Sequence, residues 1–159
     1  MKVFLFIFLK RLKELTKVIS VLKINDVWFS KTIDFLKSVP SIESIEESIL
    51  KNACIAVKED KIVGCISYEE FTCKGLIRYF VFKKALDLDY LEKLLDDLKE
   101  NALKNNIKEF VCVAESDQIK ELFKSLNFID IKKSKIFIDE EDVGNTNFKS
   151  SIFLSKQLI

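Results

Sequence analysis

The feature that most constrains the fold is a leucine repeat in the second half of the chain. Apolar side chains recur there at the spacing of one helix face, at Leu91, Leu94, Leu95, Leu98 and Ala102. Acidic residues come early in the segment and lysines come late, which suits the helix dipole. We therefore expect a long amphipathic helix over residues 91–103, packed through its leucines on an apolar surface.

Short apolar runs on either side of the repeat supply that surface. Residues 53–57 and 62–68 are joined by a polar segment of hairpin length, and residues 76–82 follow a turn that ends at Gly75. These runs predict a three-stranded antiparallel meander. Residues 109–114, after the repeat, predict a short buried strand.

The first part of the chain predicts a strand and two helices. Residues 18–24 alternate between apolar and polar side chains, as a half-buried strand does. Asp26 is placed to cap a helix, and Pro40 is placed to stop it. Ser41 is then expected to start a second helix.

The last part predicts a helix and two strands. Ser116 and Asp117 are suited to open a helix, and Asn127 is suited to end it in the left-handed conformation. Residues 129–138 and 148–158 predict a final pair of strands. The expected order is thus β-α-α-β-β-β-α-β-α-β-β.

The chain of 159 residues has only three glycines and one proline, and nothing in it resembles a linker. Residues 18–159 are therefore expected to form one domain, preceded by an apolar and basic segment at 1–17. The apolar run from Val3 to Leu9 is too short to span a membrane. The segment packs either on the domain or on a second copy of the chain, or else anchors it to a membrane surface.

Composition excludes several kinds of chemistry. There is no histidine, so histidine bases and histidine-ligated metals are excluded. The net charge is +1, and no nucleic-acid partner is expected. The cysteines at 54, 65, 73 and 112 lack metal-binding spacing, so no metal site is expected. Three of them lie in apolar runs as small hydrophobic residues, which fits a reduced, cytoplasmic protein.

Local sequences at the expected positions carry a resemblance to a known family. Ile62-Val63-Gly64 begins the second meander strand, Phe80-Val81-Phe82 ends the third, and the 116–127 helix ends in Leu122-Phe123-Lys124-Ser125-Leu126-Asn127-Phe128. Together with the element order over residues 18–159, these fragments resemble the GNAT N-acetyltransferase superfamily. The resemblance implies an α+β fold with a mixed, mainly antiparallel sheet of six to seven strands and helices on both faces.

The same resemblance implies an enzyme that moves an acetyl group from acetyl-CoA to an amine of a small molecule or peptide. It places acetyl-CoA at the end of the third meander strand and the start of the leucine-rich helix. The cofactor-binding residues that it implies are Phe80, Val81, Phe82, Leu88, Asp89, Tyr90 and Leu91. It implies Glu69 or Glu70, at the end of the second meander strand, as the general base.

Two departures from the family pattern are visible. The glycine-rich turn that lets backbone N–H groups reach the pyrophosphate is replaced by a segment containing Asp87 and Asp89, and Asp89 is also placed to cap the helix. The general-acid tyrosine is replaced by Phe123, leaving Tyr79, Tyr90, Ser116 or a water as substitutes. A non-catalytic binding or dimerisation module that has lost acetyl-CoA binding is therefore the alternative function.

Overall fold

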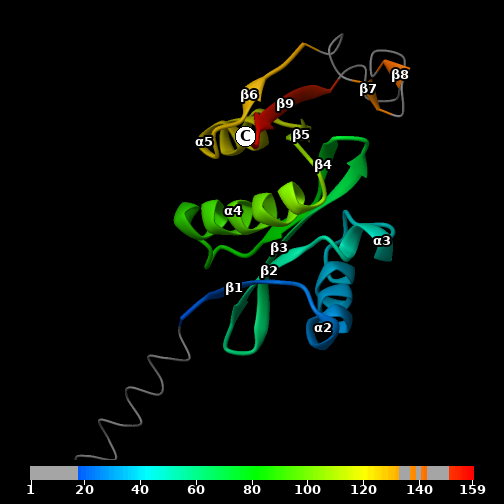
Figure 1. Cartoon of the computed structure of the whole chain (residues 1–159). Helices are drawn as coiled ribbons and strands as arrows, with labels where there is room; N and C mark the ends of the chain where they lie inside the picture. Colours follow the sequence, from blue (N-terminus) through cyan, green and yellow to red (C-terminus); the bar gives the residue numbers. More distant parts are fainter. Residues whose placement is uncertain (1–17, 133–136, 139–140, 143–150) are drawn as a thin grey trace, which may run out of the picture.

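The computed structural model of the chain describes residues 18–132, 137–138, 141–142 and 151–159 (Figure 1). Within these residues, one sheet has the strand order β1-β2-β3-β4-β5-β9-β6, and a separate pair is formed by β7 and β8. In the main sheet all neighbouring strands are antiparallel except β4 and β5, which are parallel. The elements are β1 (Ser20–Lys23), α2 (Asp26–Lys37), α3 (Glu47–Leu50), β2 (Cys54–Lys58), β3 (Lys61–Phe71), β4 (Lys74–Phe82), α4 (Leu88–Lys104), β5 (Glu109–Ala114), α5 (Asp117–Ser125), β6 (Ile129–Asp130), β7 (Phe137–Ile138), β8 (Glu141–Asp142) and β9 (Ile152–Gln157).

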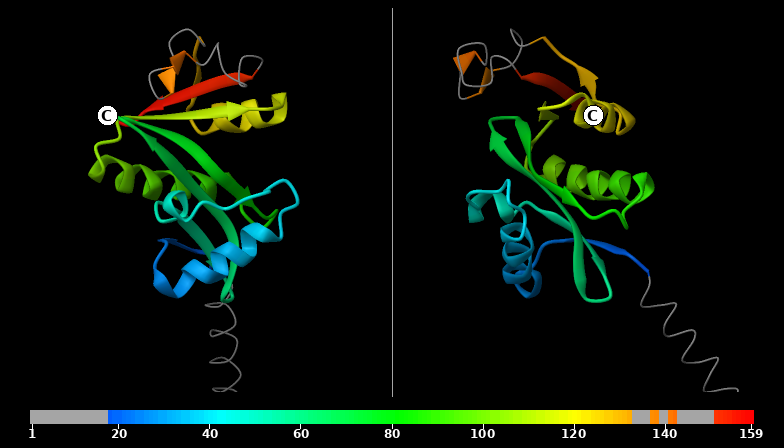
Figure 2. Two further views of the ribbon diagram at one scale, coloured as in Figure 1. Left: turned by 90° about the vertical axis from the view of Figure 1, so that its right-hand side faces the viewer. Right: turned by 180° about the vertical axis from the view of Figure 1, so that it is seen from behind.

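Helices cover both faces of the sheet. Along β2, Cys54 and Ala56 contribute to the core cluster that contains the leucines of α4, while Ile55 and Val57 contribute to the cluster beneath α2 and α3. Because alternate strand residues point to opposite faces, α4 lies on one face and α2 and α3 lie on the other. Figures 1 and 2 show α4 lying across the strands. The predicted α+β fold, with its mixed, mainly antiparallel sheet, is confirmed.

The leucine repeat forms the predicted helix and supplies most of its buried face. Leu94 and Leu98 of α4 are fully buried, and Phe123 of α5 contributes to the same cluster. The other predicted features of α5 are also confirmed. Ser116 accepts a hydrogen bond from the Ile119 N–H as the helix cap, and Asn127 has a φ of 65° after the helix ends.

Both of the first helices begin at other residues than the sequence predicted, α2 one residue earlier and α3 several residues later. Asn25, not Asp26, caps α2, because its side-chain oxygen accepts hydrogen bonds from the Val27 and Trp28 N–H groups. The second helix does not begin at Ser41. Residues 41–46 form a connection without helical structure, and α3 begins only at Glu47.

The strand boundaries also differ from the prediction in places. The turn between β2 and β3 has only two residues, because Glu59 and Asp60 both adopt positive φ values, 50° and 58°, as a tight hairpin turn requires. The final strands are shorter than expected, with β6 and β9 paired and the β7–β8 pair between them in sequence. Part of the predicted final strands and the whole segment 1–17 lie outside the described residues. No described helix has both the length and the apolar character to cross a membrane.

Candidate functional site

The parallel strands β4 and β5 pair only at one end. Lys74, Gly75 and Leu76 align with Glu109, Phe110 and Val111, and the two strands diverge beyond that point. The left view of Figure 2 shows this divergence as a V that opens away from the paired ends. In the described part of the chain, the N–H and C=O groups on this side of β4 beyond Leu76 therefore have no partner strand.

A β-bulge in β4 lies inside this opening. Cys65 of β3 pairs with Val81, but Ser67 pairs with Arg78, so Tyr79 and Phe80 together face the single residue between them on β3. Tyr79 has a φ of 52°, which is uncommon for an aromatic residue. Bulges bend a strand and redirect its side chains, so this one helps to separate β4 from β5.

The opening contains a cleft of about 670 Å³. Side chains from β4, β5, α5 and the connection 41–46 surround it. They are Ser41, Ile42, Glu43, Ser44, Leu76, Ile77, Arg78, Tyr79, Phe80, Phe82, Cys112, Val113, Glu115, Ile119, Leu122 and Phe123. The cleft is therefore bounded by α5 on one face of the sheet and by the connection 41–46 on the other.

Aromatic rings form the wall of the cleft on the α5 side. The ring of Phe80 lies 5.3 Å from that of Phe82 and 5.6 Å from that of Phe123, between centroids. Phe123 is 4% exposed and offers no proton to a reacting group. Of the expected cofactor-binding residues on β4, Phe80 and Phe82 line the cleft, while Val81 packs against the cluster beneath α2.

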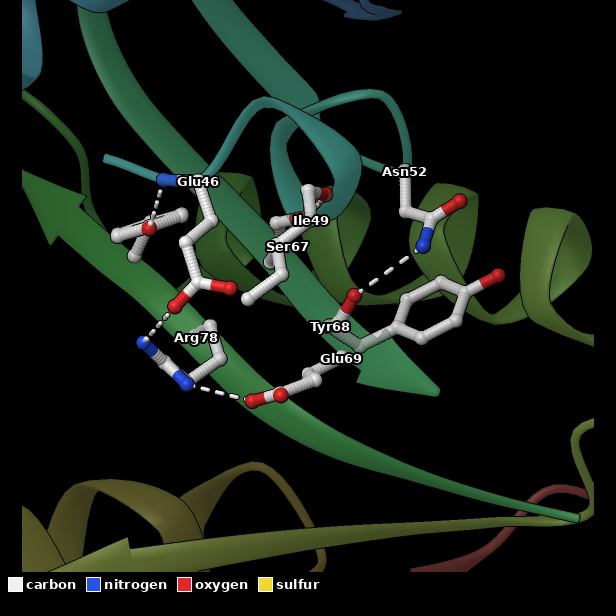
Figure 3. Close-up of polar contacts among 8 residues, drawn as sticks. Glu46, Ile49, Asn52, Ser67, Tyr68, Glu69 and Arg78 are labelled. Carbon is white, nitrogen blue, oxygen red and sulfur yellow. Dashed lines mark hydrogen bonds and ion pairs between the residues drawn. The ribbon is translucent and has the colours of Figure 1, made fainter. Parts of the chain in front are cut away.

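An ion-pair network lies on the opposite side of the cleft. The guanidinium of Arg78 contacts the carboxylates of both Glu69 and Glu46, the latter at 3.8 Å (Figure 3). The Tyr79 hydroxyl accepts a hydrogen bond of 2.8 Å from the Glu46 N–H. Together these contacts hold the end of the connection 41–46 against the bulge of β4.

The expected catalytic carboxylates lie outside the lining of the cleft. Glu69 is tied to Arg78 by an ion pair and is absent from the cleft lining. Glu70 faces Gly75, near the end where β4 and β5 are paired, roughly 13 Å along the strand from Tyr79 at about 3.3 Å per residue. Glu70 also accepts a hydrogen bond from Asn52, at 3.4 Å.

Glu115 and Glu43 line the cleft, although sequence reasoning did not single them out. Within the described residues neither has an ion-pair partner. Glu115 directly follows β5, and a polar residue at the carboxyl end of a parallel strand is the signal by which the sequence could have identified it. No comparable signal marked Glu43, because the connection that carries it was expected to be a helix.

Cys112 contributes a thiol to the lining of the cleft. Burial raises the pKa of this thiol, and a backbone hydrogen bond offsets that effect only in part. The thiol therefore stays protonated near neutral pH, which makes it a poor nucleophile. Cys112 acts here as a small apolar side chain.

The N-terminus of α4 is capped by the chain itself. Asp87 is the cap, and its carboxylate accepts a hydrogen bond of 3.2 Å from the Tyr90 N–H. The expectation that Asp89 caps this helix was wrong, since Asp89 lies inside the first turn. Leu88 is 41% exposed and Leu91 is only 3% exposed, so Leu91 belongs to the core beneath α4.

Gly64 fixes the turn that leads into α4. A Cβ atom at this position would collide with Cδ1 of Leu86, which is buried just before the helix. The Val63-Gly64 pair therefore leaves room for Leu86 to anchor the turn. Both upstream lysines are exposed, and Lys83 places its ammonium 5.9 Å from the Phe35 ring on α2.

Solved structures share this architecture although sequence comparisons find nothing. No protein-family model matches the chain, and no curated protein is significantly similar to it. N-acetylglutamate synthase from Neisseria gonorrhoeae, complexed with coenzyme A and L-arginine, superposes with a TM-score of 0.68 and 14% identity over 89% of this chain. This chain spans only 33% of that synthase.

Two structures of similar length agree. A GNAT-family acetyltransferase from Staphylococcus aureus gives a TM-score of 0.67 with 15% identity, covering 89% of this chain and 100% of that one. The protein Rv2747 from Mycobacterium tuberculosis, in complex with CoA, gives a TM-score of 0.66 with 13% identity, covering 88% and 99%. The chain therefore has the GNAT fold that its sequence predicted.

Proposed function

We propose that this domain is an N-acetyltransferase that moves an acetyl group from acetyl-CoA to an amine. The observation that carries the proposal is the cleft of about 670 Å³ between the diverging strands β4 and β5. A thioester lying in it would meet the unpaired backbone edge of β4 beyond Leu76. N–H groups fixed along that edge are suited to stabilise the negative charge that develops on a thioester carbonyl oxygen.

In the proposed reaction the nitrogen of a neutral amine attacks the acetyl carbonyl, forming a C–N bond as the C–S bond breaks. The amine loses a proton and the leaving thiolate gains one. Glu69 and Glu115 are the candidates for accepting the proton. Glu115 is favoured because it lines the cleft and has no ion-pair partner in the described residues, whereas Glu69 is held by Arg78.

Acetyl-CoA is expected to bind weakly. The Asp87 carboxylate already uses one N–H at the start of α4 and brings negative charge toward the position proposed for the pyrophosphate. Both upstream lysines are exposed, but Lys83 lies near the Phe35 ring, so Lys84 is the one without a described partner. Phe80 and Phe82, together with the β4 edge, would then supply most of the binding energy.

The same observations support a second candidate, a non-catalytic module of this fold that binds a partner. Asp87 occupies an N–H group at the start of α4 that would otherwise bind phosphate. Phe123 lacks the hydroxyl that would protonate the leaving thiolate. The two candidates differ in one measurable property, because the module transfers no acetyl group.

A transfer assay tests the enzyme. Purified protein is incubated with acetyl-CoA and a panel of primary amines, and release of free CoA thiol is followed. We expect amine-dependent release that Glu115→Gln slows by at least tenfold, as for loss of a general base. Glu100→Gln, an exposed glutamate of α4, is the matched control and should retain full activity. No release with any amine would favour the non-catalytic module.

A further inference from the structure

If the domain transfers acetyl groups as proposed, the leaving CoA thiolate needs a proton. The structure distinguishes among the hydroxyl groups that could supply it. Phe123 has no hydroxyl, and the substitutes within the chain are Tyr79, Tyr90 and Ser116. Tyr79 lines the cleft, whereas Tyr90 and Ser116 do not.

The Tyr79 hydroxyl is oriented by its partner. A phenol carries one proton, and its oxygen also accepts hydrogen bonds. At Tyr79 the oxygen accepts from the Glu46 N–H at 2.8 Å, so its own proton must point elsewhere. Within the described residues the structure shows no acceptor for that proton. Tyr79 packs partly against the cluster beneath α2 and α3 and also lines the cleft, so its hydroxyl is a donor without an acceptor among the described residues, on a residue that borders the cleft.

The surroundings of Tyr79 suit the charge that proton donation would create. The Glu46 N–H that points at the phenolic oxygen would stabilise a phenolate. The Arg78 guanidinium lies 5.6 Å from the centre of the ring and adds positive charge. Tyr79 also holds a left-handed φ of 52° in the bulge, and strained backbone of this kind is concentrated at functional sites.

We propose that Tyr79 is the general acid of the acetyl transfer, in place of the tyrosine that Phe123 replaces. As the amine nitrogen forms its bond to the acetyl carbon, the C–S bond breaks and the sulfur keeps the electron pair. The Tyr79 hydroxyl gives its proton to that sulfur, which leaves as the free thiol of CoA. Glu115 takes the proton that the amine loses and passes it to solvent, and the phenolate regains a proton from solvent.

A structural role for Tyr79 makes a different prediction. Its hydrogen bond holds Glu46 and the connection 41–46, so Tyr79→Phe removes this bond together with the acid. A merely structural role would alter binding or stability with any acetyl donor. A role as acid alters only a step in which the leaving group needs a proton.

The experiment compares native protein with Tyr79→Phe in acetyl transfer to the best amine of the panel described above. With acetyl-CoA we expect kcat to fall by about 100-fold or more, with KM for acetyl-CoA changing less than threefold. With the acetyl thioester of 4-nitrothiophenol, whose thiolate leaves without protonation, the loss should shrink to a few-fold. Tyr68→Phe removes a buried tyrosine hydroxyl outside the cleft and should leave kcat unchanged.

A second variant restores the acid at the other wall of the cleft. The double variant Tyr79→Phe with Phe123→Tyr should have a kcat at least tenfold higher than that of Tyr79→Phe alone. A Tyr79→Phe protein with native kcat, or one equally impaired with both donors and not rescued by Phe123→Tyr, would overturn the assignment of Tyr79 alone. Native protein that neither binds acetyl-CoA nor releases thiol would overturn the proposed acetyltransferase, and this inference with it.

Discussion

The cleft between β4 and β5 and the N-terminus of α4 are adjacent regions, but they differ in how they are built. The cleft follows from strand register, because β4 and β5 pair over three residues and then diverge around the bulge at Tyr79. The helix N-terminus depends on particular side chains, and there Asp87 occupies an N–H group that an anion would otherwise bind.

A fold can thus keep the space for a ligand while the groups that bind the ligand change. Backbone geometry is maintained by the whole sheet and the helices packed on it. A phosphate-binding turn needs only a few residues of the right type, and substitution of those residues does not disturb the sheet. Likeness of fold therefore supports the cleft more strongly than it supports phosphate binding.

Breaking the packing that supports both regions should destabilise the protein most. Leu94→Ala and Leu98→Ala each remove a fully buried side chain of α4 and leave a cavity above β2 and β3. Each should lower the free energy of unfolding by about 2–5 kcal/mol, measured by chemical denaturation. A loss under ~0.5 kcal/mol at both positions would show that α4 does not pack as described.

A smaller effect is expected where the two regions are joined. Gly64→Ala places a methyl group against Leu86 and should cost about 1–3 kcal/mol of unfolding free energy. Shortening the opposing side chain makes room, so Gly64→Ala should cost less in a Leu86→Ala background than in the native one. The double-mutant cycle measures this coupling. Strictly additive losses would mean that Leu86 does not anchor the turn against Gly64.

The smallest effect separates the two aspartates of the α4 turn. Asp87→Ala removes the helix cap and should lower the unfolding free energy by about 1 kcal/mol. Asp89→Ala is the matched control, because Asp89 makes no capping hydrogen bond and should change stability by less than ~0.5 kcal/mol. Chemical denaturation of both variants measures the two losses. A larger loss of unfolding free energy for Asp89→Ala than for Asp87→Ala would show that Asp89 is the cap.

Much of the fold could be predicted from periodicity. The leucines of α4, the meander and the cap at Ser116 all have local signals that the structure confirms. The connection 41–46 was mistaken for a helix because Ile42, Ile45 and Ile49 have helical spacing. Its backbone is instead tied to a distant residue, through the hydrogen bond from the Glu46 N–H to Tyr79. Such a contact leaves no local signal in the sequence.

The candidate site was less predictable, for the same reason. Phe80 and Phe82 were found from a strand fragment and do line the cleft. Arg78 and Glu115 reach the cleft only because β4 bulges and β5 diverges from it, and both features are tertiary. Asp87 rather than Asp89 became the cap because α4 begins at Leu88, and helix boundaries are the least certain part of a sequence-based prediction.

We propose that the cleft accepts acetyl-CoA while the α4 turn opposes its phosphates. Calorimetric titration with acetyl-CoA, at low and at high salt, tests it on native protein and on the variant with Asp87→Gly and Asp89→Gly. We expect weak, salt-sensitive binding by native protein, because exposed charges are screened within about 10 Å at 0.1 M salt. The double variant should bind about five- to tenfold tighter, since removing a like charge at ~4 Å relieves on the order of 1 kcal/mol. Tight, salt-insensitive binding by native protein would contradict this account of the turn, and no heat from either protein at millimolar acetyl-CoA would contradict the acetyltransferase itself.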